Sequence, residues 1–453
     1  MLCAFAALTA LPAHSGGLLT NTNQNASFLR QMSQESIIDI TGLYANPAGT
    51  AFLAPGFHLS LNVQNAKQSR DITTTFPLFA YNRNNPQPVH RFEGDALAPV
   101  IPSFHLSYNW DGKWSVNASF ALVGGGGKCE FDQGLGTFEA LYAGQIYSGL
   151  AAQFGTAMPQ LFRGYSLNAY MKGRSYQFGF TVGTTYKILE NLSAFLGTRL
   201  IYATNNYNGW VTDAKGYYLH PLTGEEQVVD LSANSLDLNA DQVGFSATPI
   251  IGLDWLVNEK WNLAFKYEMP TRLSLENKTE ANAYTAAAMQ ENPTLGQFAD
   301  GKKVREDIPG ILAAGAQYRP TDYLRFMAGW HYYFDKQAKK EGDKQKLIDK
   351  GTIEFNAGGE CDLTQWLTFS ASWQCTRYRV SDAFMNDLSF NVSSNAIGLG
   401  VRVNVSERCN IDLGYMHNFY HRRDVDTPTA AGMKSDHYYR RNRVLGIGAN
   451  LKF

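Results

Sequence analysis

The stretch Gly42-Leu-Tyr-Ala-Asn-Pro-Ala-Gly49 closes an irregular segment that runs from Gly16 to Thr50 and carries scattered polar and charged residues. From Gly56 to Phe453, by contrast, apolar and polar residues alternate in one long series. Such period-two alternation predicts β-strands with one apolar face. A short irregular segment ahead of a closed sheet is most simply a plug inside a barrel, although Asn and Pro also favour ordinary turns for local reasons.

The spacing of the predicted strands carries the most information about the fold. The strands are expected at 57–65, 104–110, 114–123, 173–188, 192–205, 242–257, 261–275, 308–319, 323–335, 352–362, 366–379, 396–405, 409–421 and 440–453. Turns after the even strands are tight, whereas the odd strands are followed by long loops at 66–102, 124–172, 206–241, 276–307, 336–351, 380–395 and 422–439. Short turns on one side and long loops on the other are typical of outer-membrane barrels. The sequence therefore predicts an all-β fold, a 14-stranded antiparallel transmembrane β-barrel with an N-terminal hatch in its lumen.

The two faces of the strands agree with this fold. In the strand 396–405, apolar residues point outward and small or polar residues point inward, as a barrel in lipid requires. The outward residues are Ile397, Leu399, Val401, Val403 and Val405, and the inward ones are Gly398, Gly400, Arg402 and Asn404. Five tryptophans at the short-turn rim predict a membrane-interface girdle, namely Trp110, Trp114, Trp255, Trp261 and Trp366.

The composition limits the classes of function. The 453-residue chain is 44% hydrophobic and 13% aromatic but only 17% charged, with a formal net charge of −1. This near-neutral charge gives no support to nucleic-acid binding through bulk electrostatics, so no nucleic-acid partner is expected. No apolar run approaches the roughly 18 residues of a transmembrane helix, and without helices only a closed barrel pairs every backbone group inside a membrane.

Residues 1–15 have the apolar core and the Ala13-x-Ser15 ending of a secretory signal. They lack a basic n-region, so either the natural start lies upstream of Met1 or the signal is truncated. We predict cleavage near Ser15–Gly16, a hatch over 16–55 and a barrel over 56–453.

The motif Tyr44-x-Asn46-Pro47-Ala48-Gly49, placed between a polar lead-in and the first strand of a large barrel, resembles the FadL-type family. These are outer-membrane channels of Gram-negative bacteria for long-chain fatty acids and hydrocarbons. The resemblance covers almost the whole chain after Ser15. It implies a hatch that closes the lumen, with Asn46, Pro47, Ala48 and Gly49 held within the barrel wall.

The resemblance also implies a function, which is passive uptake of a hydrophobic small molecule through a loop groove, followed by hatch movement and sideways release into the outer-membrane lipid. Family members open sideways at an inward kink in strand three. Here the strand 114–123 has no internal Gly or Pro, so the gate is expected at Gly124, Gly125, Gly126 and Gly127 or at a kink caused by hatch contacts. The aromatic carboxyl-terminal Phe453 resembles the signal read by the barrel insertion machinery, and a monomer is expected.

The loop 124–172 is unusually apolar for a surface segment. From Phe138 onward its apolar residues lie three and four apart, which predicts a helical hairpin. Its apolar face is expected to pack on the loop 276–307, either as a lid or as a groove for an apolar ligand. The candidate groove residues are Phe138, Leu141, Tyr142, Ile146, Leu150, Phe154, Leu161 and Phe162. A ligand carboxylate would need a nearby cation, for which Arg163 and Lys172 are the candidates.

The sequence shows no catalytic constellation, and no enzyme activity, cofactor or metal site is expected. His417 and His421 merely share one face of a strand. Cys129, in a predicted loop, and Cys361, Cys375 and Cys409 are expected to be free thiols, and Cys3 leaves with the signal. Two other functions stay open. A haem or amphipathic-ligand receptor would use His220 or His437, and a structural or adhesive surface barrel would have polar loops.

Overall fold

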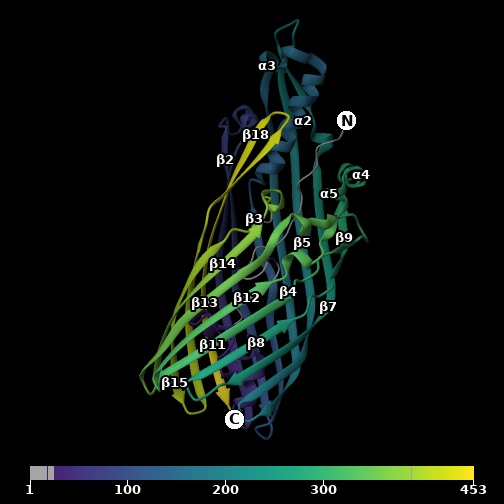
Figure 1. The fold of residues 1–453 in the computed structure, drawn as a ribbon. Coiled ribbons are helices and arrows are strands. Elements are labelled where there is room, and N and C mark those ends of the chain that lie inside the picture. Colours follow the sequence, from purple (N-terminus) through teal and green to yellow (C-terminus); the bar gives the residue numbers. More distant parts are fainter. Residues whose placement is uncertain (1–17, 19–24, 389) are drawn as a thin grey trace.

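The structure is a computed structural model that describes residues 18, 25–388 and 390–453. The predicted signal segment and its cleavage site lie outside the described residues. The strands form one antiparallel sheet of 18 strands, of which fourteen form a closed barrel and four short ones belong to hairpins at its upper end in Figure 1. The predicted 14-stranded barrel is therefore confirmed.

Each barrel strand pairs with its neighbour, and β1 closes the barrel on β18 from His58 opposite Lys452 to Thr75 opposite Ser435. The barrel strands are β1 (Gly56–Thr75), β2 (Val89–Asn109), β3 (Trp114–Phe131), β4 (Phe162–Leu189), β5 (Leu192–Leu219), β7 (Leu236–Leu256), β8 (Trp261–Glu268), β11 (Ile311–Thr321), β12 (Leu324–Tyr333), β13 (Ile348–Thr364), β14 (Leu367–Val380), β15 (Ser394–Ser406), β16 (Cys409–Tyr420) and β18 (Gly432–Lys452). The hairpin strands are β6 (Glu226–Asp230), β9 (Ser274–Ala281), β10 (Lys303–Arg305) and β17 (Arg423–Thr429).

The helices are short, except for one in the second long connection. They are α1 (Ala26–Arg30), α2 (Gly136–Phe154), α3 (Met158–Leu161), α4 (Ala283–Glu291) and α5 (Pro293–Gly296). Short 3₁₀ helices lie at Ile40–Leu43, Pro47–Phe52, Pro77–Tyr81, Gly155–Ala157, Ser232–Asn234, Asp335–Gln337, Glu341–Leu347 and Asp382–Phe384. Among the described residues, no helix combines the length and the apolar character needed to cross a bilayer.

Several predicted loops are wrong because the strands continue beyond the alternating region. β1 runs on to Thr75 and β2 begins at Val89, so most of the predicted loop 66–102 is paired strand. β3 likewise continues to Phe131, which places Cys129 in a strand rather than in a loop. Where both faces of a strand meet polar surroundings the alternation disappears, although the backbone groups still pair with the neighbouring strand.

The predicted strand 261–275 is wrong beyond Glu268. β8 ends there, Pro270 follows, and the chain resumes pairing in β9. Proline has no backbone N–H to donate, so it interrupts a strand at this point. The predicted helical hairpin is in fact one long helix, α2, followed by the single turn of α3.

The alternation of faces is confirmed where the structure can be compared with it. Outward-pointing Ile397 and Leu399 are 45% and 43% exposed, whereas a Cβ added at the intervening Gly398 would collide with the carbonyl oxygen of Leu29 in α1. The outside of the barrel is thus apolar, and the inside is filled by the N-terminal segment.

Candidate functional site

The predicted hatch motif lies against the inner wall at β5 and β7. Asn46 begins the 3₁₀ helix Pro47–Phe52, and its side-chain oxygen accepts a hydrogen bond from the Ala48 N–H. Its Nδ2 donates to the Leu253 carbonyl at 3.0 Å and to Asp254 Oδ2 at 3.2 Å. Asn46 therefore both caps the turn and ties it to β7.

The carbonyl groups of the same turn are also occupied by the wall. Ser193 Oγ of β5 donates to the Ala48 carbonyl at 2.6 Å, and Thr185 Oγ1 of β4 donates to the Pro47 carbonyl at 3.1 Å. A Cβ added at Gly49 would lie 3.2 Å from Asp254 Oδ2, which is a tight approach. The motif thus fits the wall through backbone and small side chains.

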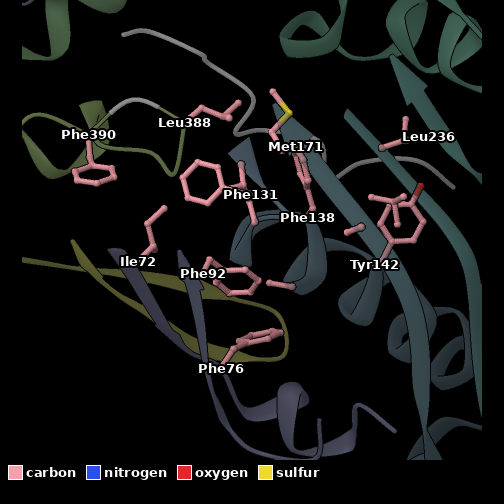
Figure 2. Close-up of a cluster of buried hydrophobic side chains, with 14 of the residues drawn as sticks. Ile72, Phe76, Phe92, Phe131, Phe138, Tyr142, Met171, Leu236, Leu388 and Phe390 are labelled. Atoms are coloured by element: carbon pink, nitrogen blue, oxygen red, sulfur yellow. The ribbon is translucent and has the colours of Figure 1, made fainter. Parts of the chain in front are cut away.

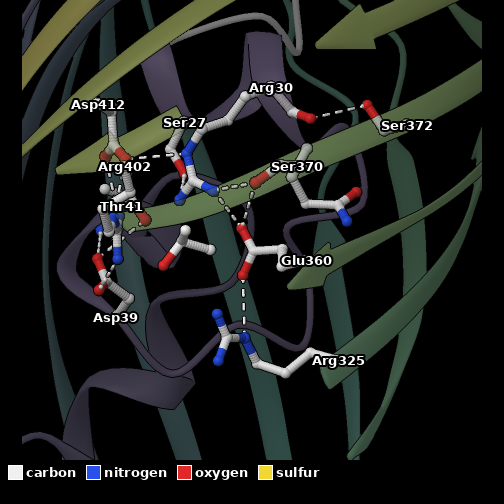
Figure 3. Close-up of polar contacts among 12 residues, drawn as sticks. Ser27, Arg30, Asp39, Thr41, Arg325, Glu360, Ser370, Ser372, Arg402 and Asp412 are labelled. Carbon is white, nitrogen blue, oxygen red and sulfur yellow. Dashed lines mark hydrogen bonds and ion pairs between the residues drawn. The ribbon is translucent and has the colours of Figure 1, made fainter. Parts of the chain in front are cut away.

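A network of buried ions ties α1 to the opposite wall, as Figure 3 shows. The Arg30 guanidinium, 2% exposed, pairs with Glu360 and donates from Nε to Asp412 Oδ1 at 2.8 Å. Arg402 bridges the same Asp412 to Asp39 of the hatch at 2.8 Å. These contacts are hydrogen-bonded on several sides, as buried ion pairs must be to offset their desolvation.

A second buried cluster holds the middle of the hatch. His331 of β12 lies between two carboxylates, with Nε2 2.7 Å from Glu35 Oε1 of the hatch and Nδ1 3.1 Å from Glu354 Oε2. Tyr333 and Thr376 donate to the same Glu354. The hatch is therefore held by polar contacts, which can exchange with water during a movement more readily than an interdigitated apolar core.

An apolar cluster, which we call the upper apolar cluster, fills the barrel above the hatch (Figure 2). It includes Ile72, Phe76, Phe92, Phe131, Phe138, Tyr142, Met171, Leu236, Leu388 and Phe390. Of the candidate groove residues, Phe138, Tyr142, Ile146, Leu150 and Phe162 are buried in this cluster, and Leu141 and Phe154 pack partly against it. Leu161 is half-buried. The side chains fill the space that a ligand would take, so the structure has the form of a closed lid.

The expected partner loop contributes to the same cluster through Met289, Leu295 and Phe298. The two apolar loops are therefore packed together. Beside them a cavity of about 560 Å³ opens among Asn82, His90, Asp132, Leu167 and Trp210. It is lined by both polar and apolar groups, and its size is within the range of small-molecule sites.

A buried polar cluster anchors α2 over the barrel. Glu139 of α2 accepts hydrogen bonds from Asn82 Nδ2 at 2.6 Å and Tyr165 OH at 2.8 Å, and His90 Nδ1 lies 2.8 Å from its Oε2. Burial lowers the pKa of His90, but the hydrogen bond and charge of Glu139 outweigh it, and the pKa is raised. His90 lies near the upper end of β2, far from the short turns.

The barrel wall has an irregular region between β2 and β3. The two strands pair from Phe104 opposite Phe120 down to Asn109, and then again only at Asp95 opposite Glu130. On the other side of β3, the register with β4 shifts between Leu122 and Gly127, where Gly125 and Gly127 have φ of +95° and +73°. The predicted gate glycines thus form a bulge beside an interrupted strand pair.

The other candidate residues lie at separate places. The girdle tryptophans are all 43% or more exposed next to the short turns, and Phe453 pairs through its backbone with Phe57. Cys129, Cys361, Cys375 and Cys409 are free. His437 contacts Asp424 at 2.7 Å, and His220 accepts from the backbone of its own turn. Arg163 is exposed and donates to backbone carbonyls.

Sequence reasoning missed the ions that hold the hatch. Arg402, Glu360 and Asp412 stand at inward positions of the predicted strands, which was a usable signal. Their partner Arg30 lies more than 300 positions away in sequence, and no local pattern links it to them.

Comparisons with known proteins support the fold. No family model and no curated protein sequence matches the chain. A FadL homologue from Pseudomonas aeruginosa superposes with a TM-score of 0.69 at 15% identity, over 97% of this chain and 100% of that one. The P. putida toluene transporter TodX gives 0.56 at 11%, over 98% and 96%, and the Ralstonia pickettii toluene transporter TbuX 0.54 at 12%, over 94% and 99%. The predicted resemblance to the FadL-type family is confirmed at the level of fold.

Proposed function

We propose that the protein is an outer-membrane channel for the passive uptake of hydrophobic small molecules. The observation that carries the proposal is the upper apolar cluster, which lies directly above a hatch held by polar contacts. The apolar band of the barrel and its tryptophan rim support a position in a membrane. The similar structures include a FadL homologue and toluene transporters, which supports a hydrophobic ligand.

The proposed route begins at the loops. An apolar molecule enters between α2 and its neighbours and replaces side-chain contacts of the upper apolar cluster with its own. Burial of about 25 cal/mol per Å² of apolar surface gives such a molecule affinity without ionic contacts. Displacement of the hatch turn Pro47–Phe52 then opens the path toward the wall, and the bulge at Gly124–Gly127 beside the interrupted β2–β3 pairing is the proposed sideways exit. Insertion through Phe453 and a monomeric state remain predictions.

The test is to purify the folded barrel in a mild detergent and to identify co-purifying small molecules by mass spectrometry. Fatty acids or hydrocarbons are expected in the wild type. Phe138→Asp and Phe154→Asp place a charge in or against the upper apolar cluster and should remove most of the bound ligand. Gln153→Asp, on the exposed face of the same helix, is the matched control and should retain it.

Two outcomes would contradict the proposal. A barrel that carries no ligand and also binds no added fatty acid or aromatic hydrocarbon would leave the fold without this function. A porphyrin in the wild type would favour a haem receptor instead.

A further inference from the structure

Arg440 on β18 is a charged side chain that the protein buries without pairing it. It is 0% exposed, and none of its three guanidinium nitrogens has a hydrogen-bond partner among the described residues. The hydroxyl of Tyr420 is also buried without a partner, and the ring of Tyr420 lies 5.0 Å from the guanidinium carbon. Buried charges are normally paired and hydrogen-bonded, so this group of donors points to a ligand.

A second arginine stands directly opposite. Arg70 of β1 faces Arg440 across the β1–β18 pair and is only 5% exposed. Within the described chain its guanidinium bonds neutral oxygens alone, the Leu388 carbonyl at 3.4 Å and Gln68 Oε1 at 3.3 Å. Like charges directly opposite each other on neighbouring strands are destabilising. The ligand-free protein therefore holds two positive charges together in the lumen.

The nearest acidic groups are already occupied. Asp436, four residues from Arg440 on the same strand, pairs with Lys434 and accepts from Thr74. Asp387 accepts from the Tyr438 hydroxyl and from the Thr137 N–H. Asp71 binds Arg91 and Arg441, on the other face of the strand pair. These carboxylates are committed to other donors, so neutralisation is left to a group from outside the chain.

The surroundings of the two arginines are apolar. The Phe390 ring lies 5.9 Å from the Arg440 guanidinium carbon, and a cavity of about 30 Å³ beside Arg70 is lined by Cys129, Phe131 and Leu388. Such a space holds a group of roughly the size of a water molecule. Gly126 and Gly127 of the β3 bulge also line it. The cavity thus connects the arginines to the upper apolar cluster and to the proposed exit.

We propose that Arg440 and Arg70 form a recognition site for the carboxylate head of an amphipathic ligand whose apolar body lies in the upper apolar cluster. The inference rests on the proposed function and narrows its ligand from hydrophobic molecules in general to organic acids. A guanidinium binds a carboxylate through two parallel hydrogen bonds, and the Tyr420 hydroxyl is a further donor. An inorganic anion would lose its hydration among these aromatic rings without gaining apolar contacts.

The experiment compares dodecanoate with dodecanol, which has the same chain and no charge, in a maltoside detergent at about pH 8, where the acid is ionised. Binding is measured by calorimetry on the intact barrel. The wild type should bind dodecanoate roughly ten- to a hundredfold more tightly than dodecanol, as expected for a charge-assisted contact. Arg440→Gln should lose that preference and keep its affinity for dodecanol. Arg441→Gln, on the adjacent outward position of the same strand, should keep both.

A stability readout separates recognition from a structural role. Each folded variant is identified by its heat-modifiable gel mobility, and its midpoint of thermal unfolding is measured without ligand. Removal of an unpaired buried charge should raise the midpoint for Arg440→Gln, whereas the loss of a structural contact would lower it. Arg440→Lys keeps the charge but not the two parallel bonds, so it should retain part of the preference for dodecanoate.

The outcomes are distinguishable. Equal wild-type affinity for acid and alcohol, or a preference that survives in Arg440→Gln, would overturn the carboxylate site and leave the channel standing. Failure of the wild type to bind either compound would remove the proposed function and this site with it.

Discussion

At the scale of single residues, the buried pair of His90 and Glu139 makes the anchoring of α2 dependent on pH. The folded-state pKa of His90 is raised above its ordinary value of 6.5. The stabilisation from this pair is therefore fully present below about pH 6.5 and is lost as the pH rises through the raised pKa. We expect α2 to detach more readily in alkaline solution, seen as faster limited proteolysis within residues 136–161 at pH 9 than at pH 6.

The matched variant is His90→Gln, which keeps a hydrogen-bond donor for Glu139 but does not titrate. It should be cleaved at nearly the same rate at both pH values. Equal cleavage of the wild-type helix at the two pH values would contradict the role assigned to His90. Cleavage in the barrel strands serves as the reference for changes in protease activity.

At the scale of elements, the bulge in β3 separates two kinds of glycine. A Cβ at Gly125 would collide with the backbone of Ser175 and lie 2.7 Å from Tyr176 Cα, whereas a Cβ at Gly127 would meet nothing within 4 Å. Both have positive φ, which costs a non-glycine residue about 1–2 kcal/mol. Gly125→Ala must therefore rearrange the bulge, while Gly127→Ala only strains it. We expect uptake of a radiolabelled fatty acid into cells to fall strongly in the first variant and little in the second.

Equal amounts of folded barrel in the outer membrane are the control for this comparison. Unchanged uptake in Gly125→Ala would place the exit elsewhere in the wall. A fall of the same size in both variants would show that strain, rather than the shape of the bulge, limits transport.

The elements also show how far the sequence could predict the structure. Alternation revealed the strands wherever one face meets an apolar surrounding, as in Ile397 and Leu399. It failed for Gln68–Asp71, where the β1–β2 ladder continues between polar faces. The hatch motif was recognisable because Asn46 and Pro47 are local signals. The partners of Arg30, and the absence of partners at Arg440, are properties of distant segments in contact and have no local pattern.

At the scale of the whole molecule, the outer surface changes character part of the way up the barrel. Trp255 lies beside a short turn, and ten residues further up the wall a row of outward aromatic rings joins Phe178, Tyr202 and Phe245. Ten residues of tilted strand span about 25 Å, the height of an outer-membrane apolar band. Above Tyr202 the outward residues of β5 are polar, including Asn206 and Asn208. The long upper part of the barrel in Figure 1 thus stands clear of the band.

This division predicts a different environment for two tryptophans on neighbouring strands. Trp210 lies eight residues beyond Tyr202 on β5 and stacks on Tyr170, with ring centroids 5.7 Å apart. In single-tryptophan variants reconstituted into vesicles with brominated acyl chains, Trp255 should be strongly quenched and Trp210 hardly at all, since it lies about 20 Å higher. Trp373, exposed on the outer wall within the band, should be quenched and reports correct insertion. Equal quenching of Trp210 and Trp255 would mean that lipid reaches the upper strands, so a ligand would enter the upper apolar cluster from the membrane rather than from the medium.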